Sequence, residues 1–194
     1  MLDSQILNFW EEEIGHLSEQ QAEFILDRVK NHPHANCLEI GFAGGRHTYS
    51  ILKTFNPKRM ISLDINFDYQ RGRKKINQIK EEFPNSVFIE QDSKTAINKE
   101  FIKQYFPEGI DYALIDGGHQ YEDAMFDMTN VYPFINQNGL MIVDDFKSKV
   151  CPLNEVDRAV NTFAKNQKLS FEAVSLEDGK GMAIFTKNIR LKVI

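Results

Sequence analysis

Acidic side chains follow four of the apolar segments of this sequence, at the point where each segment ends. They are Asp64, then Asp92, then Asp116, and finally the adjacent pair Asp144 and Asp145. Carboxylates can accept hydrogen bonds from sugar hydroxyls, bind a hard cation such as Mg²⁺, or transfer protons. If the apolar segments are parallel strands, their carboxyl ends meet at one edge of a sheet, and these side chains should converge there.

A glycine-containing turn follows the first apolar segment and precedes a helical pattern; it contains Gly41, Ala43, Gly44 and Gly45. Glycines let the backbone approach a ligand closely, and the N–H groups of the following helix point toward the same place. The turn is not a dinucleotide-binding fingerprint, because Ala43 and Arg46 stand where that fingerprint needs glycines, and the lysine of a P-loop is missing. A plain strand-to-helix turn is the alternative interpretation.

Specific roles can be expected for two of the carboxylates, Glu39 and Asp64. Glu39 lies inside an apolar segment, where a lone buried carboxylate costs several kcal/mol, so it must meet a cation or hydrogen-bond donors. A purely structural partner, such as a nearby lysine, is the alternative to a functional one. Asp64 stands at the end of the second segment, where a carboxylate can accept both hydroxyls of a ribose. Its alternative role is to cap a helix that starts near Phe67.

The elements that must position these residues are read from the apolar pattern. Seven short apolar segments are predicted to be strands: 37–42, 60–65, 87–91, 112–117, 140–146, 171–176 and 181–186. Amphipathic segments are predicted to be helices at 46–55, 68–83, 94–105, 120–133 and 153–167. The first five strands are continuously apolar, which is typical of strands covered on both faces. The pattern predicts an α/β fold: a Rossmann-like, doubly wound, mostly parallel seven-stranded sheet, with an antiparallel hairpin at one edge and helices on both faces.

The composition is that of a globular protein. The chain has 194 residues, 42% of them hydrophobic, and 23 basic against 28 acidic residues give a net charge of −5. We expect one domain over residues 1–194, with an N-terminal helical cap at 1–35 and the Rossmann-like core at 36–194. Ser18 is expected to cap a helix in the first 30 residues. Residues 71–75, RGRKK, are expected to form the solvated face of a helix rather than a nucleic-acid site.

Several functional classes are disfavoured. No apolar segment has the length of a membrane span, and the N-terminus does not resemble a secretory signal, so we expect a cytoplasmic protein without a membrane partner. The two cysteines, Cys37 and Cys151, form neither a disulfide framework nor a metal motif. The excess of acidic over basic residues argues against nucleic acid as a partner. Phe9 and Trp10 are candidates for covering a partner subunit in a homodimer.

Several of these motifs together resemble the class I S-adenosylmethionine-dependent methyltransferases. The similarity runs from about residue 36 to 165, and it is greatest to the small, metal-dependent O-methyltransferases of the macrocin and catechol types. The motifs that carry it are LEIGFAGGRHT, the strand ending at Asp64, QDS at 91–93, IDGGHQYEDAMFDM at 115–128 and GLMIVDDF at 139–146.

The resemblance implies a role for each motif residue. In the cofactor site, Glu39, Gly41 and the backbone from Ala43 through Gly44 to Gly45 would hold the methionine part of S-adenosylmethionine, Asp64 the ribose, and Asp92 with Ser93 the adenine. Asp116 would border both the cofactor and a Mg²⁺ ion, and Asp144 and Asp145 would complete the metal site. His119 falls where this branch places a general base, while the catechol-type relatives have lysine there.

We therefore predict an S-adenosylmethionine-dependent methyltransferase that acts on a hydroxyl of a small molecule, with Mg²⁺ assistance and His119 as the general base. Two other functions stay open: a metal-independent class I methyltransferase directed to N, C or O, and a non-catalytic protein that binds S-adenosylmethionine. Structural alternatives stay open as well. His119 could cap the next helix, Asp145 could face solvent, and Asp144 could cap a loop.

Overall fold

The computed structural model describes residues 2–10, 17–150 and 155–188, so Cys151 and the first residues of the predicted helix at 153–167 lie outside the described part. The strands are β1 (Asn36–Ile40), β2 (Arg59–Asp64), β3 (Val87–Glu90), β4 (Ile110–Ile115), β5 (Ile135–Asp144), β6 (Glu172–Ser175) and β7 (Gly181–Thr186). The helices are α1 (Ser4–Trp10), α2 (Glu19–Val29), α3 (Arg46–Phe55), α4 (Gly72–Glu82), α5 (Ser93–Ala96), α6 (Lys99–Tyr105), α7 (Tyr121–Val131) and α8 (Val156–Gln167).

The seven strands form one sheet in the order β3-β2-β1-β4-β5-β7-β6. Strands β1 to β5 are parallel to one another, and β7 is antiparallel to both β5 and β6. The predicted doubly wound sheet with an antiparallel hairpin is confirmed. Because β6 runs in the same direction as β5, the turn after β6 lies at the same edge of the sheet as the carboxyl ends of β1 to β5. The strand order reverses between β1 and β4, which is where such sheets bind ligands.

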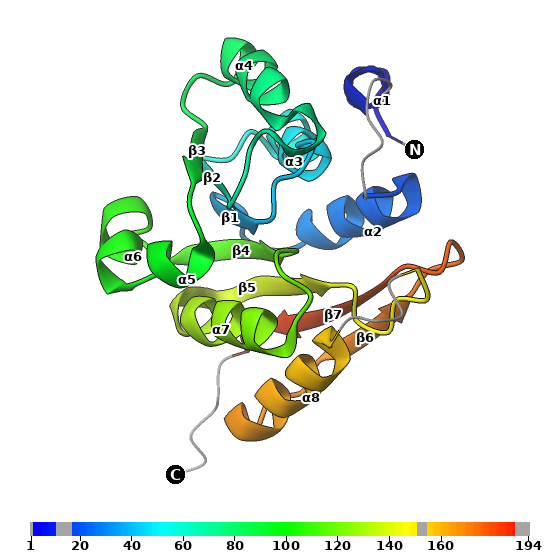
Figure 1. The fold of residues 1–194 in the computed structure, drawn as a ribbon, viewed down its shortest axis with the longest axis vertical. Helices are drawn as coiled ribbons and strands as arrows, with labels where there is room; N and C mark the ends of the chain where they lie inside the picture. Colours follow the sequence, from blue (N-terminus) through cyan, green and yellow to red (C-terminus); the bar gives the residue numbers. More distant parts are fainter. Residues whose placement is uncertain (1, 11–16, 151–154, 189–194) are drawn as a thin grey trace.

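Helices cover both faces of the sheet (Figure 1). One apolar core joins the sheet to α5, α6, α7 and α8, and a second joins it to α1, α2, α3 and α4. Strands β1, β2 and β4 and the second half of β5 are largely buried, as their continuous apolar character predicts. The prediction is wrong for β3, which lies at the edge of the sheet and is only partly buried. Within the described residues, no helix combines the length and apolarity of a membrane-spanning segment.

Three predicted helices differ from the observed ones. The segment at 68–83 is divided into a 3₁₀ turn, Tyr69–Arg71, and α4, because Arg71 has a left-handed φ of 58°. The other two are interrupted or shortened. The segment at 94–105 is divided into α5 and α6, because Ile97 is extended and Asn98 caps α6 by accepting a hydrogen bond from the Phe101 N–H (2.9 Å). The segment at 120–133 becomes α7 followed by a 3₁₀ turn, Tyr132–Phe134, that contains a proline. In both places a local backbone preference overrides the longer amphipathic pattern.

The N-terminal helices pack onto the second core. Ser18 caps α2 with a reciprocal capping box through Gln21, which confirms the predicted cap. The expected solvated face at 71–75 holds for Arg71, Arg73 and Lys74 but is wrong for Lys75, which is buried. The Lys75 ammonium lies over the Phe9 ring, 4.1 Å from its centroid, and donates a hydrogen bond to the Phe9 carbonyl. The packing of α1 thus satisfies this charge, and the partner is 66 residues away in sequence.

Candidate active site

A cavity of about 790 Å³ opens at the carboxyl ends of the parallel strands. Its volume is in the range of small-molecule sites. The predicted site residues that line it are Gly41, Ala43, Asp64, Asp92, Ser93, Asp116, His119, Asp144 and Asp145. Glu39, Gly44 and Gly45 are not part of its lining. The convergence expected for the strand ends is therefore observed.

Gly41 allows β1 and β4 to come together at the point where the strand order reverses. Its φ is +93°, and a Cβ atom built on it would lie 1.8 Å from the carbonyl oxygen of Asp116. No side chain fits in that space. The glycine turn therefore has a structural reason to contain glycine here, and it brings the backbone of β1 next to Asp116 at the cavity wall.

Asp64 holds the glycine turn in place. Its Oδ2 accepts hydrogen bonds from the N–H groups of Phe42 (2.7 Å) and Ala43 (3.0 Å), and its Oδ1 accepts one from Asn66 (3.0 Å). A carboxylate has about four acceptor positions, so roughly one is left for a ligand. The structure therefore supports a shared role for Asp64, in which it shapes the turn and has capacity for one ribose hydroxyl rather than both.

Glu39 lies beneath the cavity in a buried polar network and is 1% exposed. His47 Nδ1 lies 2.8 Å from Glu39 Oε1, and Thr48 Oγ1 donates to the other carboxylate oxygen. On the far side of the ring, Tyr112 Oη lies 2.7 Å from His47 Nε2, and burial raises the pKa of the Tyr112 phenol well above its usual value. The neutral phenol can donate to His47, which in turn donates to Glu39. Histidine and threonine, rather than the lysine named as an alternative, satisfy this carboxylate.

Asp92 and Ser93 form the cavity wall at the end of β3. Asp92 caps α5 by accepting a hydrogen bond from the N–H of Lys94 (2.9 Å), and Ser93 bonds to the buried Asp127 of α7. Burial raises the pKa of Asp127 to about 7, with further contributions from the nearby carboxylates Asp123 and Asp92. Asp127 is a residue that the sequence reading missed.

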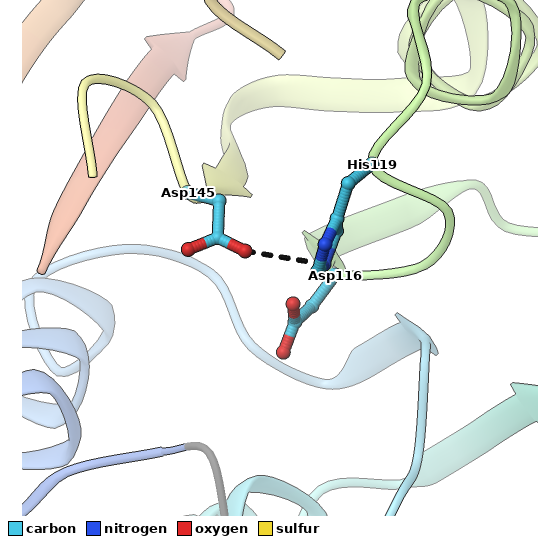
Figure 2. A group of neighbouring side chains, drawn as sticks. All are labelled: Asp116, His119 and Asp145. Carbon is cyan, nitrogen blue, oxygen red and sulfur yellow. Dashed lines mark ion pairs between the residues drawn. The ribbon is translucent and has the colours of Figure 1, made fainter. Parts of the chain in front are cut away.

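His119 and two aspartates form the reactive end of the cavity (Figure 2). Nε2 of His119 lies 3.1 Å from Asp145 Oδ2, and ligating atoms of Asp116, His119 and Asp145 all lie within 4.8 Å of one another. Asp145 has a φ of 57°, a region that costs a non-glycine residue on the order of 1 kcal/mol or more and often marks functional sites. The tight turn after β5 aims its carboxylate at the imidazole.

Asp144 lies in the same cavity but stands apart from this group of three. Its Oδ1 accepts a hydrogen bond from Gln21 Nε2 (2.6 Å), so the N-terminal part of α2 reaches the site. Burial and the charge of Asp145 raise the pKa of Asp144 to about 6. The metal role predicted for Asp144 stays a prediction.

The charges of the cavity favour a cationic ligand. Six carboxylates line it, against the two ammonium groups of Lys94 and Lys180, and Lys94 is paired with Asp123. Burial and the charges of Asp144 and Asp145 raise the pKa of Asp116 well above its usual value. Bringing a positive charge to this end of the cavity relieves that repulsion.

The sequence reading also missed several residues of the cavity wall. Lys180, in the turn between β6 and β7, lies in the wall and lowers the pKa of both Asp116 and Asp144. Ile65, Tyr69 and Val150 are 70%, 55% and 54% exposed, and all three line the cavity. The position of the β6–β7 turn at this edge of the sheet could have pointed to Lys180.

Comparison with known proteins identifies the family. A family model described as a methyltransferase domain matches residues 38–146, which is more than half of the chain. The chain therefore belongs to this methyltransferase domain family, with the class I fold and a resemblance to the small O-methyltransferases. Among curated proteins, the uncharacterized protein R132 of Acanthamoeba polyphaga mimivirus is 39% identical over 41 residues. That match spans 21% of this chain and only 19% of R132.

Solved structures show the same fold at low sequence identity. The O-methyltransferase TomG from Streptomyces achromogenes, in complex with S-adenosylmethionine, has a TM-score of 0.72 at 12% identity, covering 97% of this chain and 91% of TomG. An O-methyltransferase from Bacillus cereus in complex with S-adenosylhomocysteine has a TM-score of 0.71 at 13% identity, covering 96% and 92%. The N-methyltransferase NodS from Bradyrhizobium japonicum has a TM-score of 0.60 at 14% identity, covering 88% and 96%.

Proposed function

We propose that this protein transfers the methyl group of S-adenosylmethionine to a hydroxyl of a small molecule, with His119 as general base and Mg²⁺ bound at the adjacent carboxylates. The observation that carries the proposal is the pairing of His119 Nε2 with Asp145 Oδ2 at 3.1 Å, beside Asp116, in the cavity that the glycine turn and Asp64 also border. A base and a cofactor-sized space thus share one cavity. The methyltransferase domain family and its O-methyltransferase structural neighbours support the same function.

The cofactor fits the end of the cavity between β2 and β4. Asp64 has capacity for a ribose hydroxyl, and Asp92 and Ser93 would border the adenine, with the exposed apolar surfaces of Ile65 and Tyr69 available to its rings. The bound cofactor would supply a methyl group already activated by a positively charged sulfur. That charge matches the negative lining of the cavity, as electrostatic complementarity requires.

The carboxylates at this end of the cavity fit Mg²⁺, but with two ligands instead of the three predicted from the sequence. Asp116 and Asp145 would hold the ion, because Mg²⁺ is commonly bound through one or two carboxylates together with water. His119 is a less suitable ligand, since a hard cation prefers oxygen to imidazole nitrogen. The bound ion would lower the pKa of an acceptor hydroxyl and relieve the repulsion between the buried carboxylates.

The chain's own residues would then orient and deprotonate the acceptor. In the tautomer in which His119 donates its Nε2–H to Asp145, the ring is held in place and its basic lone pair is on Nδ1. His119 would accept the proton of the acceptor hydroxyl there, and Asp145 would stabilise the resulting imidazolium. The glycine turn and Asp64 would fix the cofactor so that the acceptor oxygen lies in line with the bond that breaks.

The direct test has two measurements. Calorimetry should show that S-adenosylmethionine binds and that nicotinamide dinucleotides do not. Radiolabelled S-adenosylmethionine, incubated with the protein, Mg²⁺ and a panel of sugars, phenols and vicinal diols, should give a methylated product with at least one hydroxyl compound. Absence of cofactor binding would refute the proposal, and binding without transfer across the panel would favour a non-catalytic binding protein.

A second candidate is a metal-independent methyltransferase of the same class. The pairing of His119 with Asp145 favours this candidate too, because an Asp145 oxygen that is paired with His119 orients the base without a metal ion. Transfer that is equally fast in EDTA and in Mg²⁺ would favour this candidate. A loss of transfer in EDTA that added Mg²⁺ restores would favour the metal-assisted reaction.

A further inference from the structure

Lys180 is a cavity cation that neither the sequence motifs nor the family match includes. It lies in the turn between Ser175, the last residue of β6, and Gly181, the first of β7. Because β6 is parallel to β5, this turn lies at the carboxyl edge of the sheet, beside the loop that follows β5 (Figure 1). Lys180 therefore faces the cavity at the end that also holds Asp144, Asp145 and His119.

The turn that carries Lys180 is closed by its own hydrogen bonds. The Lys180 carbonyl accepts from the Leu176 N–H (2.8 Å), and the Lys180 N–H donates to Asp178 Oδ1 (3.0 Å). Gly179 has a φ of +85°, as a tight turn of this kind requires. The backbone of Lys180 is therefore fixed, and only its side chain is adjustable.

Contacts to two other elements fix the turn over the cavity. The Gly179 carbonyl accepts from the N–H of Lys149 in the loop after β5 (2.9 Å), and Asp178 accepts from the Ser18 hydroxyl at the start of α2. Gly181 passes so close to that loop that a Cβ atom on it would lie 2.1 Å from the carbonyl oxygen of Phe146. The turn, the loop after β5 and the start of α2 thus form one wall of the cavity.

The positive charge of the Lys180 ammonium affects the acidic residues of the cavity, but the ammonium forms no ion pair with these described residues. Its charge lowers the pKa of Asp116 and of Asp144. The ion pairs formed among residues 2–10, 17–150 and 155–188 do not include Lys180, whereas the other cavity lysine, Lys94, is paired with Asp123. Within these ranges, the Lys180 ammonium is therefore not held by an ion pair.

Without a bound metal ion, the protein groups at this end of the cavity, Lys180 apart, disfavour an oxyanion. Asp116, Asp144 and Asp145 are all here, and an acceptor oxygen that loses its proton to His119 would develop negative charge among them. A fixed cation beside that oxygen offsets the repulsion and favours the ionised form. Val150 adds an exposed apolar surface next to the turn, and its Cγ1 would be 3.5 Å from a Cβ atom on Gly179.

We propose that Lys180 is a further catalytic residue, whose ammonium donates a hydrogen bond to the acceptor oxygen and stabilises its oxyanion form. The inference rests on the proposed function. It assigns the base to His119 and the oxyanion-stabilising cation to Lys180, with Val150 contacting the carbon skeleton.

The test uses 4-nitrophenol, an acidic hydroxyl compound whose ionisation is visible in its absorbance. It is titrated into the full chain with S-adenosylhomocysteine bound and EDTA present, so that no metal ion contributes. Wild-type protein should bind the phenolate and raise the ionised fraction at a fixed pH below the pKa of the free phenol. Lys180→Met should weaken phenolate binding roughly 10- to 100-fold, as expected for the loss of a hydrogen bond between charged groups, and Lys180→Arg should restore most of it.

Lys149→Met is the matched control, because this exposed lysine in the adjoining loop contacts the turn through its backbone N–H and should bind the probe like wild type. Equal phenolate binding by wild type and Lys180→Met would overturn the inference, as would the absence of probe ionisation on wild type. Either result would leave the proposed function intact if S-adenosylmethionine still binds and is consumed. Thermal melting of Lys180→Met near the wild-type temperature would separate a lost interaction from a lost fold.

Discussion

The carboxylate of Asp64, at the end of β2, accepts a hydrogen bond of 3.0 Å from the backbone N–H of Ala43 in the glycine turn. The same oxygen accepts from Phe42, so a residue expected to bind the cofactor also holds the turn that borders the cofactor's other end. Ala43 has a φ of 44°, a conformation that a non-glycine residue adopts at a cost of roughly 1 kcal/mol or more. Asp64 therefore stabilises a strained turn, in addition to the ribose-binding role proposed for it.

The first prediction separates these two roles. Asp64→Ala should weaken S-adenosylmethionine binding by about 1.5–3 kcal/mol and also lower the free energy of unfolding by roughly 1–3 kcal/mol, because backbone N–H groups lose their acceptor. Asp64→Asn keeps one acceptor oxygen and should lose less stability. Calorimetry and urea unfolding give the two quantities. Unchanged affinity in Asp64→Ala would contradict the ribose role, and unchanged stability would contradict the role in the turn.

The second prediction concerns the contact between β1 and β4. Gly41→Ala would place a Cβ atom 1.8 Å from the Asp116 carbonyl oxygen, so the two strand ends must separate. Gly179→Ala is the matched control, since Gly179 has a similar φ of +85° but a Cβ atom there meets only ordinary contacts at 3.5 Å and beyond. We expect the control to lose about 1 kcal/mol of stability and Gly41→Ala to lose several times more. Equal losses in urea unfolding would mean that backbone conformation, rather than the close approach, requires Gly41.

The positions of the site residues were predictable wherever they follow from strand ends. Asp64, Asp92, Asp116 and Asp145 each close an apolar segment, and parallel strands bring such ends together whatever the details of packing. Residues brought to the cavity by contacts between distant elements were not predictable in this way. Gln21 reaches Asp144 across 123 residues of sequence.

Single side chains inside a recognised pattern were also misjudged. The run at 71–75 reads as a solvated basic face, yet α1 covers Lys75, and no local pattern shows that Phe9 will be its partner. The partners of His47 were likewise not predictable from the sequence. It stands in the glycine-turn motif without an evident partner in sequence, and the fold places it between Glu39 and Tyr112.

The third prediction concerns stability and pH. Asp127 has an ordinary pKa of 3.8, and burial raises it to about 7 in the folded protein. Between about pH 4 and pH 7 the unfolded chain loses this proton while the folded protein keeps it, so the free energy of unfolding should fall as pH rises through this range. The fall attributable to Asp127 should approach about 1.4 kcal/mol for each pH unit.

Asp127→Asn keeps the shape but cannot ionise, so it should flatten this slope and gain stability relative to wild type at pH 8. Glu122→Gln, which removes an exposed carboxylate from the same helix, should leave the slope unchanged. Urea unfolding at a series of pH values measures both. Parallel stability profiles for wild type and Asp127→Asn would show that Asp127 ionises normally in the folded protein.

The fourth prediction concerns the metal. Asp116→Asn and Asp145→Asn should each abolish the stimulation of methyl transfer by Mg²⁺ and weaken the binding of Mn²⁺, measured as a spectroscopic substitute, by at least tenfold. Asp144→Asn should have a smaller effect, because Asp144 is outside the group of three and one of its oxygens is engaged by Gln21. An Asp144→Asn variant that loses Mn²⁺ as completely as Asp145→Asn would restore the ligand set predicted from sequence.

The fifth prediction assigns the general base. His119→Ala should lower the rate of methyl transfer by roughly 10²–10⁴-fold at neutral pH, because it removes the imidazole that the proposal assigns to accept the hydroxyl proton beside Asp145. Cofactor affinity should barely change, since the imidazole lies at the Asp145 end of the cavity. Wild-type activity should rise with pH, as expected for a general base that acts in its unprotonated form, and this rise should disappear in His119→Ala. Asp145→Asn should keep the base but lose its orientation, giving a lower rate with a rise that is still present. The pH–rate profiles of the three proteins, at saturating cofactor, make the comparison. If wild type and His119→Ala gave profiles of the same shape and nearly the same height, His119 would not be the general base.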